Sequence, residues 1–361
     1  MSKICFFVGS LEGSGGTERV SIWLANELSK VSGYDVYIIS LQGGNEPFFP
    51  VSQGISCSTL FSTYGSGTLR FPLIVSRLKK FLKKNAIDVL IDVESMLALY
   101  STPAISGTAV RHICWEHFNY NVDLGRKTRR VARRLAAIFA DDVVTLTERD
   151  KQLWMSGAKC NANMISIPNP ITVIQPNDIN QNKDDVVLAV GRLTYQKGFD
   201  MLLEAWQQVS KEYPQWKLKI IGSGEDEEAL LQRSVELGIT QTIEFIPKTN
   251  HIENYYLKSK LFVMSSRFEG LPLVLIEAQA YGLPIVSFDC DTGPAEVVQD
   301  GYNGWLCGAG NVMALKDALA MGIEASMDEK QYQELTTNSV NNSKRFSTET
   351  ILDTWLKLLS K

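Results

Sequence analysis

The sequence lacks the features that mark a metal site, a disulfide framework or a membrane-spanning segment. Its six cysteines are scattered, and no two of them are separated by two residues as in zinc or redox motifs. Its three histidines show no paired spacing either. No apolar run approaches the roughly 20 residues of a membrane-spanning helix, and the N-terminal run is too short for a signal peptide. We therefore expect a cytoplasmic protein, at most attached to a membrane surface.

The composition is that of an ordinary globular protein with more than one domain. A chain of 361 residues suffices for two or three domains with large cores. The net charge of −4 is unevenly spread, with 19 basic against 14 acidic residues in 1–170 and 17 against 26 in 171–361. The basic front half indicates that it faces something negative. Nucleic acid is not expected, because the pI of about 5.6 is acidic and no motif interleaves aromatic and basic residues.

Strand-like and helix-like segments alternate along nearly the whole chain. Short runs rich in β-branched and aromatic residues predict strands, and apolar residues three to four positions apart predict helices. The predicted strands are 3–10, 35–41, 88–93, 109–117, 142–147, 186–192, 216–224, 242–247, 261–266 and 284–289. The predicted helices are 17–31, 70–85, 126–134, 199–213 and 347–361. This alternation is typical of parallel sheets with helices on both faces.

One segment, 167–185, interrupts the alternation. It holds three prolines and four asparagines without helical periodicity, so it is interpreted as an interdomain linker. We therefore predict an α/β protein of two doubly wound, Rossmann-like domains that face a central cleft. In such sheets ligands bind beyond the carboxyl ends of the strands, so functional residues should directly follow strands.

Two acids, Glu269 and Glu277, flank an apolar stretch in the rear half, and Gly270, Leu271 and Pro272 form a turn after the first of them. Proline suits a first helical position, so a helix is predicted to begin there. The free N–H groups and dipole at its start would suit an anion such as a phosphate. The two acids either hold two parts of a ligand whose phosphates lie between them, or are solvated acids on a surface helix.

Two cations follow the first predicted strand of the rear half. Gly191 and Arg192 end that strand, and Lys197 and Gly198 come five residues later. Arg192 and Lys197 would thus converge from one loop. Two cations suit a diphosphate, since a guanidinium can bind two oxygens at once. The alternative is a solvated loop with a helix cap.

The first predicted strand leads into a glycine-rich loop, GSLEGSGGTERV, that opens the first helix. Glycine lets backbone approach a ligand closely, and a helix N-terminus favours an anion. The spacing of Gly9, Gly13, Gly15 and Gly16 is not the dinucleotide fingerprint GxGxxG, and no phosphate loop GxxxxGK[ST] occurs. Many turns between a strand and a helix are rich in glycine, so the loop alone is weak evidence.

His117 ends a predicted strand at the sheet edge that should face the cleft. It either donates a hydrogen bond to a sugar hydroxyl and helps to stabilise developing charge, or is a structural histidine with its hydrogen bonds satisfied.

Two predicted helices carry clusters of basic residues. The clusters are Lys79, Lys80, Lys83 and Lys84, and Arg126, Arg129, Arg130, Arg133 and Arg134. Like charges four residues apart disfavour an isolated helix, which indicates a use for them. Anionic lipid head groups or an acceptor pyrophosphate would fit, and the alternative is a solvated helix face.

Together these motifs resemble the retaining glycosyltransferases of the two-Rossmann-domain (GT-B) type, family 4. The matching elements are GGTERV, WEH, IPNP, GRLTYQKG, IIGSGE and FEGLPLVLIE, which occur in the family's order and span nearly the whole chain. The last holds the family's Glu-x7-Glu motif, with Glu269 and Glu277 as its acids. SSRFEGLPLVLIEA and DCDTGPAEVV carry a narrower resemblance to bacterial transferases that build lipopolysaccharide, O-antigen or capsule units from UDP-hexoses.

The resemblance implies a role for each matching position. Arg192 and Lys197 would bind the donor diphosphate, and Glu277 would accept hydrogen bonds from the ribose hydroxyls. Glu269 would hold donor-sugar hydroxyls near the anomeric carbon, and His117 would contact the donor sugar and the reaction centre. The further binding positions are Gly16 on the phosphate and acceptor side, the backbone of Gly270, Leu271, Leu273 and Val274 at sugar and phosphate, and Pro247 and Lys248 at the base. Pro247 stands where the family tends to have glycine, a departure in the base site.

The resemblance also implies the reaction. A hexose would pass from a UDP-sugar to a lipid-linked or core oligosaccharide with retention, and with neither a metal nor any cofactor besides the donor substrate. The first domain would be discontinuous, 1–168 with 345–361, around a nucleotide-sugar-binding domain at 169–344, and the enzyme would work in the cytoplasm or on the inner face of the cytoplasmic membrane. A nucleotide-sugar epimerase on the same fold and a non-catalytic nucleotide-sugar-binding subunit are the alternatives.

Overall fold

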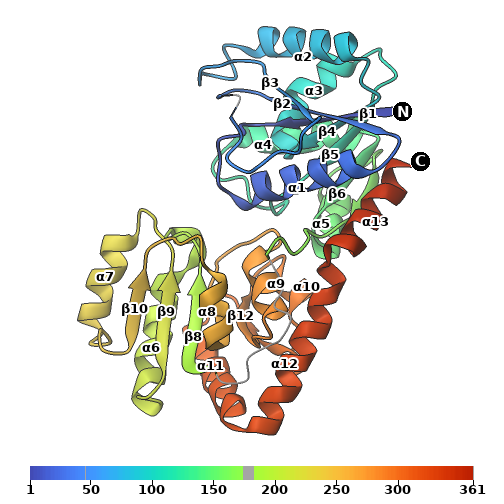
Figure 1. The fold of residues 1–361 in the computed structure, drawn as a ribbon. Helices are drawn as coiled ribbons and strands as arrows, with labels where there is room; N and C mark the ends of the chain where they lie inside the picture. Colours follow the sequence, from blue (N-terminus) through green and yellow to red (C-terminus); the bar gives the residue numbers. More distant parts are fainter. Residues whose placement is uncertain (45, 174–182, 361) are drawn as a thin grey trace. The chain divides into compact units, whose positions relative to one another are not determined.

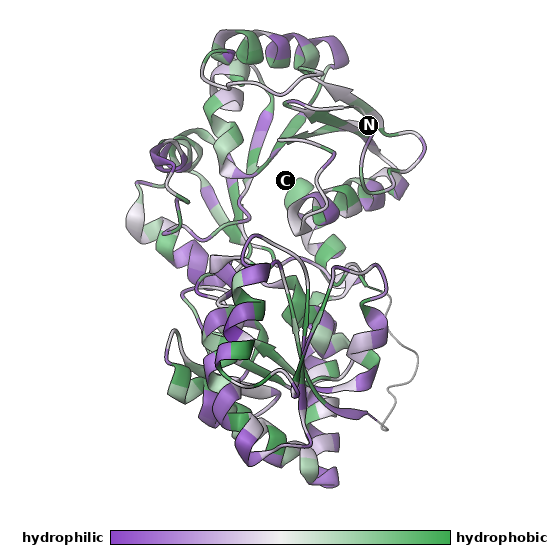
Figure 2. Ribbon diagram, turned by 90° about the vertical axis from the view of Figure 1, so that its left-hand side faces the viewer, coloured by the Kyte–Doolittle hydropathy of each residue, from purple (hydrophilic) through white to green (hydrophobic). Residues whose placement is uncertain are grey.

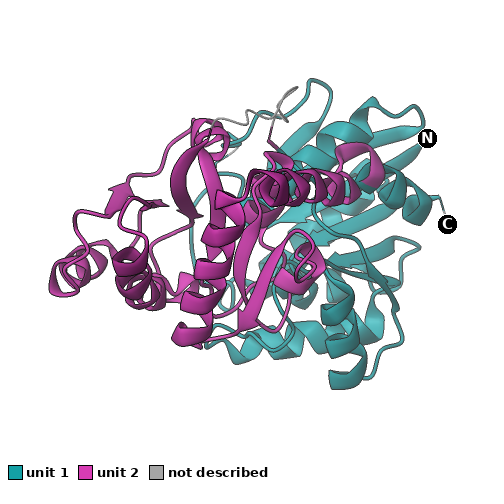
Figure 3. Cartoon of the chain, turned by 90° about the horizontal axis from the view of Figure 1, so that it is seen from below, with its two compact units in different colours: residues 1–172, 351–361 teal, residues 173–350 magenta. Residues whose placement is uncertain are grey.

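The computed structural model describes residues 1–44, 46–173 and 183–360, and the chain divides into two compact units (Figures 1 and 3). Unit 1 is Met1–Thr172 with Ile351–Lys361, and unit 2 is Val173–Thr350. The sequence had placed these boundaries at 168/169 and 344/345. Residues 174–182 of the predicted linker 167–185 lie outside the described residues.

Unit 1 is built on a seven-stranded parallel sheet with the order β3-β2-β1-β4-β5-β6-β7. Its strands are β1 (Ser2–Val8), β2 (Tyr34–Ser40), β3 (Ser56–Thr59), β4 (Val89–Val93), β5 (Arg111–Trp115), β6 (Asp142–Thr145) and β7 (Asn163–Ser166). Its helices are α1 (Gly16–Lys30), α2 (Phe71–Asn85), η1 (Ser95–Leu97), α3 (Ala98–Ile105), α4 (Lys127–Phe139), α5 (Glu148–Gly157) and most of α13 (Thr348–Leu359). The strand order reverses between β1 and β4, which makes their carboxyl ends the switch point of the sheet.

Unit 2 repeats this design with six parallel strands in the order β10-β9-β8-β11-β12-β13. Its strands are β8 (Asp184–Val190), β9 (Lys217–Ile221), β10 (Ile243–Ile246), β11 (Ser259–Met264), β12 (Ile285–Asp289) and β13 (Gly304–Gly308). Its helices are η2 (Tyr195–Lys197), α6 (Phe199–Glu212), α7 (Glu227–Glu236), α8 (Glu253–Lys258), α9 (Leu273–Ala280), α10 (Pro294–Val297), α11 (Val312–Met327), α12 (Glu329–Ser343) and η3 (Lys344–Phe346). Its switch point lies between β8 and β11.

The central strands are apolar because helices cover both faces of each sheet. All five residues of β4 are buried, and Leu188 and Ala189 of β8 are completely buried. Figure 2 shows mainly hydrophobic strands inside each unit and helices whose outward sides are hydrophilic. The two parallel sheets with flanking helices confirm the predicted doubly wound α/β class.

Three strands were missed from the sequence, and all three lie at sheet edges. β3 and β7 begin with an exposed residue and are otherwise only partly buried, and β13 ends in one. An edge strand borders only one neighbour, so it needs no continuous apolar run and gives a weak signal.

Asp92 is a charged exception inside β4. Its Oδ2 atom lies 2.8 Å from His112 Nε2 on β5 and also accepts a hydrogen bond from Ser101 on α3. All three side chains are at most 1% exposed. These hydrogen bonds compensate for part of the cost of burial and tie α3 to the sheet, while Asp92 Oδ1 and His112 Nδ1 have no hydrogen-bond partner among the described residues.

The final helix, α13, belongs to unit 1 through two contacts at its end. Trp355 is completely buried and packs edge-on against Trp115, with ring centroids 4.8 Å apart. Arg111 Nη1 donates to the carbonyl of Leu358 at 3.0 Å. The last residues of the chain therefore complete the core of the unit that the first residues begin.

Candidate functional site

The loops after β8 and β11 start side by side, because these two strands pair across the switch point of unit 2. The loops comprise residues 191–198 and 265–272. The carboxyl ends of neighbouring parallel strands at a switch point are where open α/β sheets bind ligands. The predicted residues Arg192, Lys197 and Glu269 belong to these two loops.

An ion pair joins the loops. Lys197 Nζ lies 2.6 Å from Glu269 Oε1, and the two side chains are 18% and 8% exposed. Two hydrogen bonds hold the backbones beside it: Ser265 Oγ donates to the Lys197 carbonyl at 3.0 Å, and Gln196 Nε2 donates to the Phe268 carbonyl at 3.0 Å. The sequence assigned Lys197 and Glu269 separate roles, and the structure brings them into direct contact.

Gly198 allows the loops to approach this closely. Its φ of 62° is in the left-handed region that favours glycine, and a Cβ there would collide with the carbonyl oxygen of Ser265. Gly191 is also close-packed, since a Cβ would lie 3.2 Å from the Lys197 side chain. A larger residue at position 198 would move the loop that carries Lys197 away from Glu269.

Arg267 is a residue of this site that the sequence gave no reason to select. Its guanidinium donates to both carboxylate oxygens of Asp200, at 2.9 and 2.6 Å, and to the carbonyl of Tyr195 at 2.7 Å. It also stacks on the Tyr195 ring, 4.1 Å from the centroid. Asp200 neutralises this cation, so Arg267 serves to fix η2 against the loop after β11.

Arg192 lies at the turn between β8 and η2, where its carbonyl accepts from the Thr194 N–H at 2.9 Å. The residue is exposed, and within the described part of the chain its side chain has no hydrogen bond or ion pair. Its convergence with Lys197 on a diphosphate stays a prediction.

Helix α9 starts one residue later than predicted. Pro272 is its N-cap, with φ −74° and ψ 103°, and Leu273 is its first helical residue. No side chain of the described residues caps this end, so the first-turn N–H groups lack the usual capping oxygen. The turn and the first helical positions are the predicted backbone contacts Gly270, Leu271, Leu273 and Val274.

The loop after β12 supports this turn from behind. Thr292 Oγ1 donates to the Glu269 carbonyl at 2.6 Å. Gly293 has a φ of 100°, and a Cβ there would lie 2.6 Å from Pro272 Cδ and 2.7 Å from the Gly270 carbonyl oxygen. Thr292 and Gly293 thus hold the acid and the helix start in place, a role that local sequence does not reveal.

Glu277 lies inside α9 rather than on a solvated face. It is 4% exposed, and its Oε2 accepts a hydrogen bond from the hydroxyl of Tyr256 at 3.1 Å. The alternative of a surface helix with two solvated acids is therefore wrong, because Glu269 is also only 7% exposed.

The predicted base contacts, Pro247 and Lys248, directly follow β10 and are exposed. The Lys248 N–H donates to Ser223 Oγ at 3.3 Å, which ties this segment to the loop after β9. Pro247 has no N–H to offer a base.

In unit 1, Gly16 is the first residue of α1. The side chain of Glu18, in the first turn, folds back over the loop: a Cβ on Gly13 or Gly15 would lie 2.7 or 2.6 Å from its carboxylate oxygens. A carboxylate therefore already occupies this helix end, where the dipole favours it. An anion at Gly16 would have to compete with Glu18.

His117 lies two residues beyond β5, which ends at Trp115, so the predicted strand ran too far. Its Nε2 is buried and has no hydrogen-bond partner among the described residues. Burial lowers the pKa of His117 to about 4, with Glu116 opposing the shift. The ring is therefore neutral at pH 7, and an unsatisfied ring nitrogen contradicts the structural alternative in which its hydrogen bonds are met.

A buried ion pair fixes the loop that carries His117. Glu116 Oε2 accepts from Arg133 Nε at 3.1 Å and from Ser95 Oγ, and its Oε1 accepts from the backbone N–H groups of His117 and Phe118 at 3.0 Å. The side chains of Arg133 and Glu116 are 2% and 0% exposed.

Glu94 follows β4 at the switch point of unit 1 with a strained backbone, φ 93° and ψ 131°. Such a conformation is rare for any residue but glycine. Its Oε1 lies 2.6 Å from Arg129 Nη2. Burial raises the pKa of Glu94 to about 7, with Arg129 partly opposing the shift.

The predicted basic face of helix α4 is only partly exposed, because two of its arginines are buried. Arg129 and Arg133 are 4% and 1% exposed and pair with Glu94 and Glu116, so neither can face a membrane. The exposed cations of the segment are Arg126, Lys127, Arg130 and Arg134. On α2 the four predicted lysines Lys79, Lys80, Lys83 and Lys84 are all exposed.

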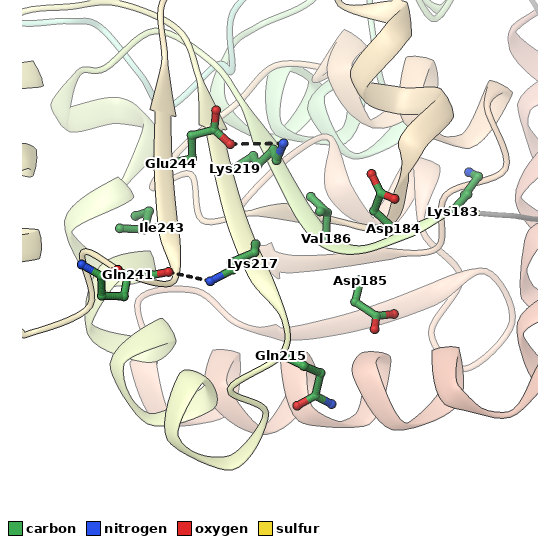
Figure 4. Close-up of a pocket in the computed structure, with 10 residues that line it drawn as sticks. All are labelled: Lys183, Asp184, Asp185, Val186, Gln215, Lys217, Lys219, Gln241, Ile243 and Glu244. Carbon is green, nitrogen blue, oxygen red and sulfur yellow. Dashed lines mark hydrogen bonds and ion pairs between the residues drawn. The ribbon is translucent and has the colours of Figure 1, made fainter.

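A hollow of about 750 Å³ lies at the opposite, amino ends of β8, β9 and β10 (Figure 4). Its cations are occupied: Lys219 pairs with Glu244 at 3.1 Å, Lys217 donates to the Gln241 carbonyl at 2.6 Å, and Lys183 donates to the Tyr281 carbonyl at 2.9 Å. It contains none of the predicted site residues, so its size does not make it the functional site.

No cluster of three or more histidine, cysteine, aspartate or glutamate side chains in the described part of the chain could hold a metal ion. None of the described helices is long and apolar enough to cross a membrane.

Comparison with known proteins covers both units. Residues 14–173 match Glycosyltransferase Family 4, and residues 173–341 match Glycosyl transferases group 1. An uncharacterized glycosyltransferase of Haemophilus influenzae is 39% identical over 99% of this chain and 100% of its own length. The amylovoran biosynthesis glycosyltransferase AmsD of Erwinia amylovora is 34% identical over 84% of this chain and 85% of its own. An N-acetyl-D-galactosaminyltransferase of Campylobacter jejuni, whose name gives a PP-undecaprenol-linked substrate, is 29% identical over 100% and 99%.

Solved structures share the fold over the full chain. The lipopolysaccharide outer core galactosyltransferase WaaB superposes with a TM-score of 0.79 at 23% identity, over 99% of each chain. Anabaena Alr3699/HepE, solved in complex with UDP and glucose, has a TM-score of 0.80 at 20% identity, over 100% of each chain.

Proposed function

Because this chain belongs to the family 4 glycosyltransferases and has the GT-B fold, we propose that it transfers a hexose from a UDP-sugar to a lipid-linked or core oligosaccharide in the synthesis of a bacterial surface polysaccharide. The names of its relatives support this choice, since they concern amylovoran, an undecaprenol-linked glycan and the lipopolysaccharide core.

One observation carries the proposal: the Lys197–Glu269 pair at the switch point, next to the turn that opens α9. The ammonium has three donors, and Glu269 uses one of them. In the proposed site the other two bind diphosphate oxygens, and the first-turn N–H groups of α9, which follow Glu269 in the chain, add further donors. A cation and a helix start at one place suit the departure of a nucleoside diphosphate, which builds negative charge on phosphate.

The carboxylate of the pair serves the sugar. Glu269 is held by Lys197 and, through its carbonyl, by Thr292. A fixed carboxylate accepts hydrogen bonds from hydroxyls, so Glu269 would hold the donor sugar with its anomeric carbon close to the leaving oxygen. Arg192 would bind the diphosphate from the same loop, and Glu277 the ribose.

The proposed reaction proceeds with retention. The acceptor hydroxyl would attack on the face that the diphosphate leaves, with a phosphate oxygen as base, and neutral His117 would donate a hydrogen bond at the reaction centre. In this scheme the protein's cations do the work of a metal, so neither a metal nor another cofactor takes part. Activity that is lost in EDTA and restored by Mg²⁺ or Mn²⁺ would contradict this part.

The acceptor would reach the enzyme at the inner face of the cytoplasmic membrane. The exposed cations of α4 and α2 support peripheral attachment to anionic lipid, as does the basic excess of residues 1–170. The buried Arg129 and Arg133 take no part in it.

The test is an incubation of UDP-Glc, UDP-Gal, UDP-GlcNAc and UDP-GalNAc with undecaprenol-diphosphate-linked and lipopolysaccharide-core oligosaccharides. Mass spectrometry should show one hexose or N-acetylhexosamine added, and NMR of the product should give the anomeric configuration of the donor. Interconversion of donors without acceptor would instead identify an epimerase. UDP binding without turnover of any donor would identify a binding subunit.

A further inference from the structure

Glu277 is buried, where an ionised carboxylate is costly unless hydrogen-bond donors surround it. Its neighbours therefore determine how the carboxylate is oriented. The carboxylate is 4% exposed and belongs to a helix that is buried from Leu275 to Ala280. A buried carboxylate needs hydrogen-bond donors around it, and the terminal torsion of a glutamate is otherwise broad. A partner that fixes this torsion therefore decides which way the oxygens point.

Tyr256 is such a partner. It comes from α8, and its hydroxyl lies 3.1 Å from Glu277 Oε2. The tyrosine ring is completely buried, is stacked on Tyr281 at 5.3 Å and 25°, and lies 6.1 Å from the Phe262 ring. Tyr281 is the C-cap of α9, so the ring is held between β11 and the end of the helix that carries Glu277. The hydroxyl has little freedom to follow the carboxylate if the carboxylate turns.

We infer that Tyr256 is a positioning residue, whose hydroxyl orients the Glu277 carboxylate toward the ribose hydroxyls of a nucleoside diphosphate. This rests on the proposed function, because it needs Glu277 to be the ribose acceptor. A phenol donates to a carboxylate and a ribose hydroxyl does the same, so the two donors are compatible with one carboxylate, which has about four acceptor sites. The base plays no part, so the inference covers UDP, GDP and ADP alike.

A purely structural role of the same hydrogen bond makes a different prediction. If Tyr256 only stabilises the fold around a buried acid, its loss lowers the melting temperature and weakens ribo- and deoxyribonucleotides equally. If it orients Glu277, its loss removes part of the preference for the ribose hydroxyl.

The experiment is isothermal titration of the full chain with UDP and with 2′-deoxy-UDP. The Tyr256→Phe variant should bind UDP about tenfold more weakly, the size expected for a hydrogen bond to a charged group, while 2′-deoxy-UDP affinity stays nearly constant. The dissociation constant for 2′-deoxy-UDP divided by that for UDP, which measures the preference for the ribose hydroxyl, should therefore fall. Tyr332→Phe is the matched control: Tyr332 is a buried tyrosine of unit 2 whose hydroxyl donates to the Lys260 carbonyl at 3.1 Å, and its loss should leave the ratio unchanged.

Glu277→Ala distinguishes the ribose contact of Glu277 from the positioning role of Tyr256. If thermal unfolding shows that the alanine variant does not fold, Glu277→Gln is used instead. A Glu277 variant that keeps the wild-type ratio would show that Glu277 does not hold the ribose, which contradicts the proposed function. A Glu277 variant with a lowered ratio and a Tyr256→Phe variant with the wild-type ratio would overturn the role of Tyr256 alone. Absence of wild-type binding to UDP, GDP and ADP would overturn both.

Discussion

The six strands of unit 2 follow the same order as the first six of unit 1, but the ion pairs beyond the carboxyl ends of the two sheets differ in exposure. In unit 2, Lys197 and Glu269 meet at 2.6 Å with side chains 18% and 8% exposed. In unit 1, Glu116 and Arg133 meet at 3.1 Å with side chains 0% and 2% exposed. The acid of each pair lies in a loop after a strand, but only the first pair is partly exposed.

The difference indicates that the strand order determines which loops carry the two acids, and that burial determines whether an ion pair can contact a ligand. A fully buried pair must satisfy its own hydrogen bonds, and Glu116 does so with Ser95 and two backbone N–H groups. Such a pair fixes a loop. A partly exposed pair keeps N–H donors that a phosphate can reach, so such an ion pair can bind an anionic ligand.

The largest expected effect tests the buried side of the comparison. Arg133→Met should lower the free energy of unfolding by about 3–5 kcal/mol, because it leaves the Glu116 carboxylate buried without its cation. The matched control is Arg130→Met, on the same helix, whose solvent-accessible pair with Asp123 should contribute little to stability. Urea denaturation measures both, and equal losses would break the distinction between the two arginines.

Glu269→Gln tests the accessible side. Transfer should fall by about a hundredfold or more, since the charge that holds Lys197 and, in the proposed reaction, the donor sugar is lost. UDP affinity should stay the same or rise, because Lys197 no longer shares its charge with a carboxylate. Initial rates and calorimetry check this against Glu244→Gln, which removes a similar pair with Lys219 at the other end of the sheet. Full transfer activity of Glu269→Gln would exclude the proposed role.

The pH dependence of stability tests the burial of Glu94 in unit 1. The pKa of Glu94 is raised from 4.5 to about 7, so the folded state holds this proton more tightly than the unfolded state. Its stabilising contribution is complete below pH 4.5, declines as the pH rises to about 7, and is constant above. Glu94→Gln cannot titrate, so the free energy of unfolding of wild type minus variant should fall by about 3 kcal/mol between pH 4.5 and 8. Urea denaturation at both pH values measures it, and a constant difference would contradict the raised pKa.

Arg192→Ala should weaken UDP binding about tenfold, the effect of losing one charge-assisted contact at an exposed position. Arg233 is a partly exposed arginine of α7 in unit 2 that pairs with Glu204 and Glu236, and Arg233→Ala should leave UDP affinity unchanged. Equal calorimetric affinity of wild type and Arg192→Ala would remove Arg192 from the diphosphate site.

The smallest effect concerns the surface of unit 1. Arg134→Ser should reduce binding to vesicles rich in anionic lipid about fivefold, since one exposed cation near such a surface contributes about 1 kcal/mol. Lys211→Ser on α6 of unit 2 should leave sedimentation with the vesicles unchanged. A similar loss in both variants would indicate an effect of net charge and not of this helix.

Much of the fold followed from periodicity and from the short apolar runs, because strands covered on both faces cannot be polar. The edge strands β3, β7 and β13 were not predicted, because they are only partly buried and have no continuous apolar run. The candidate site followed from the positions of Arg192, Lys197, Glu269 and Glu277 after strands and within a helix. Arg267, Thr292 and Tyr256 escaped, because each acts through a partner that is distant in sequence and no local pattern marks it.

The sequence by itself determined that two parallel sheets form and which loops follow their central strands, and therefore which loops can carry a site. Only the tertiary structure decided that Lys197 meets Glu269, 72 positions further along the chain, and that Arg129 and Arg133 turn inward while Arg130 and Arg134 face solvent. The physical reason is that the periodicity of a helix gives relative directions along one element. Which of those directions is buried depends on what the rest of the chain packs against it.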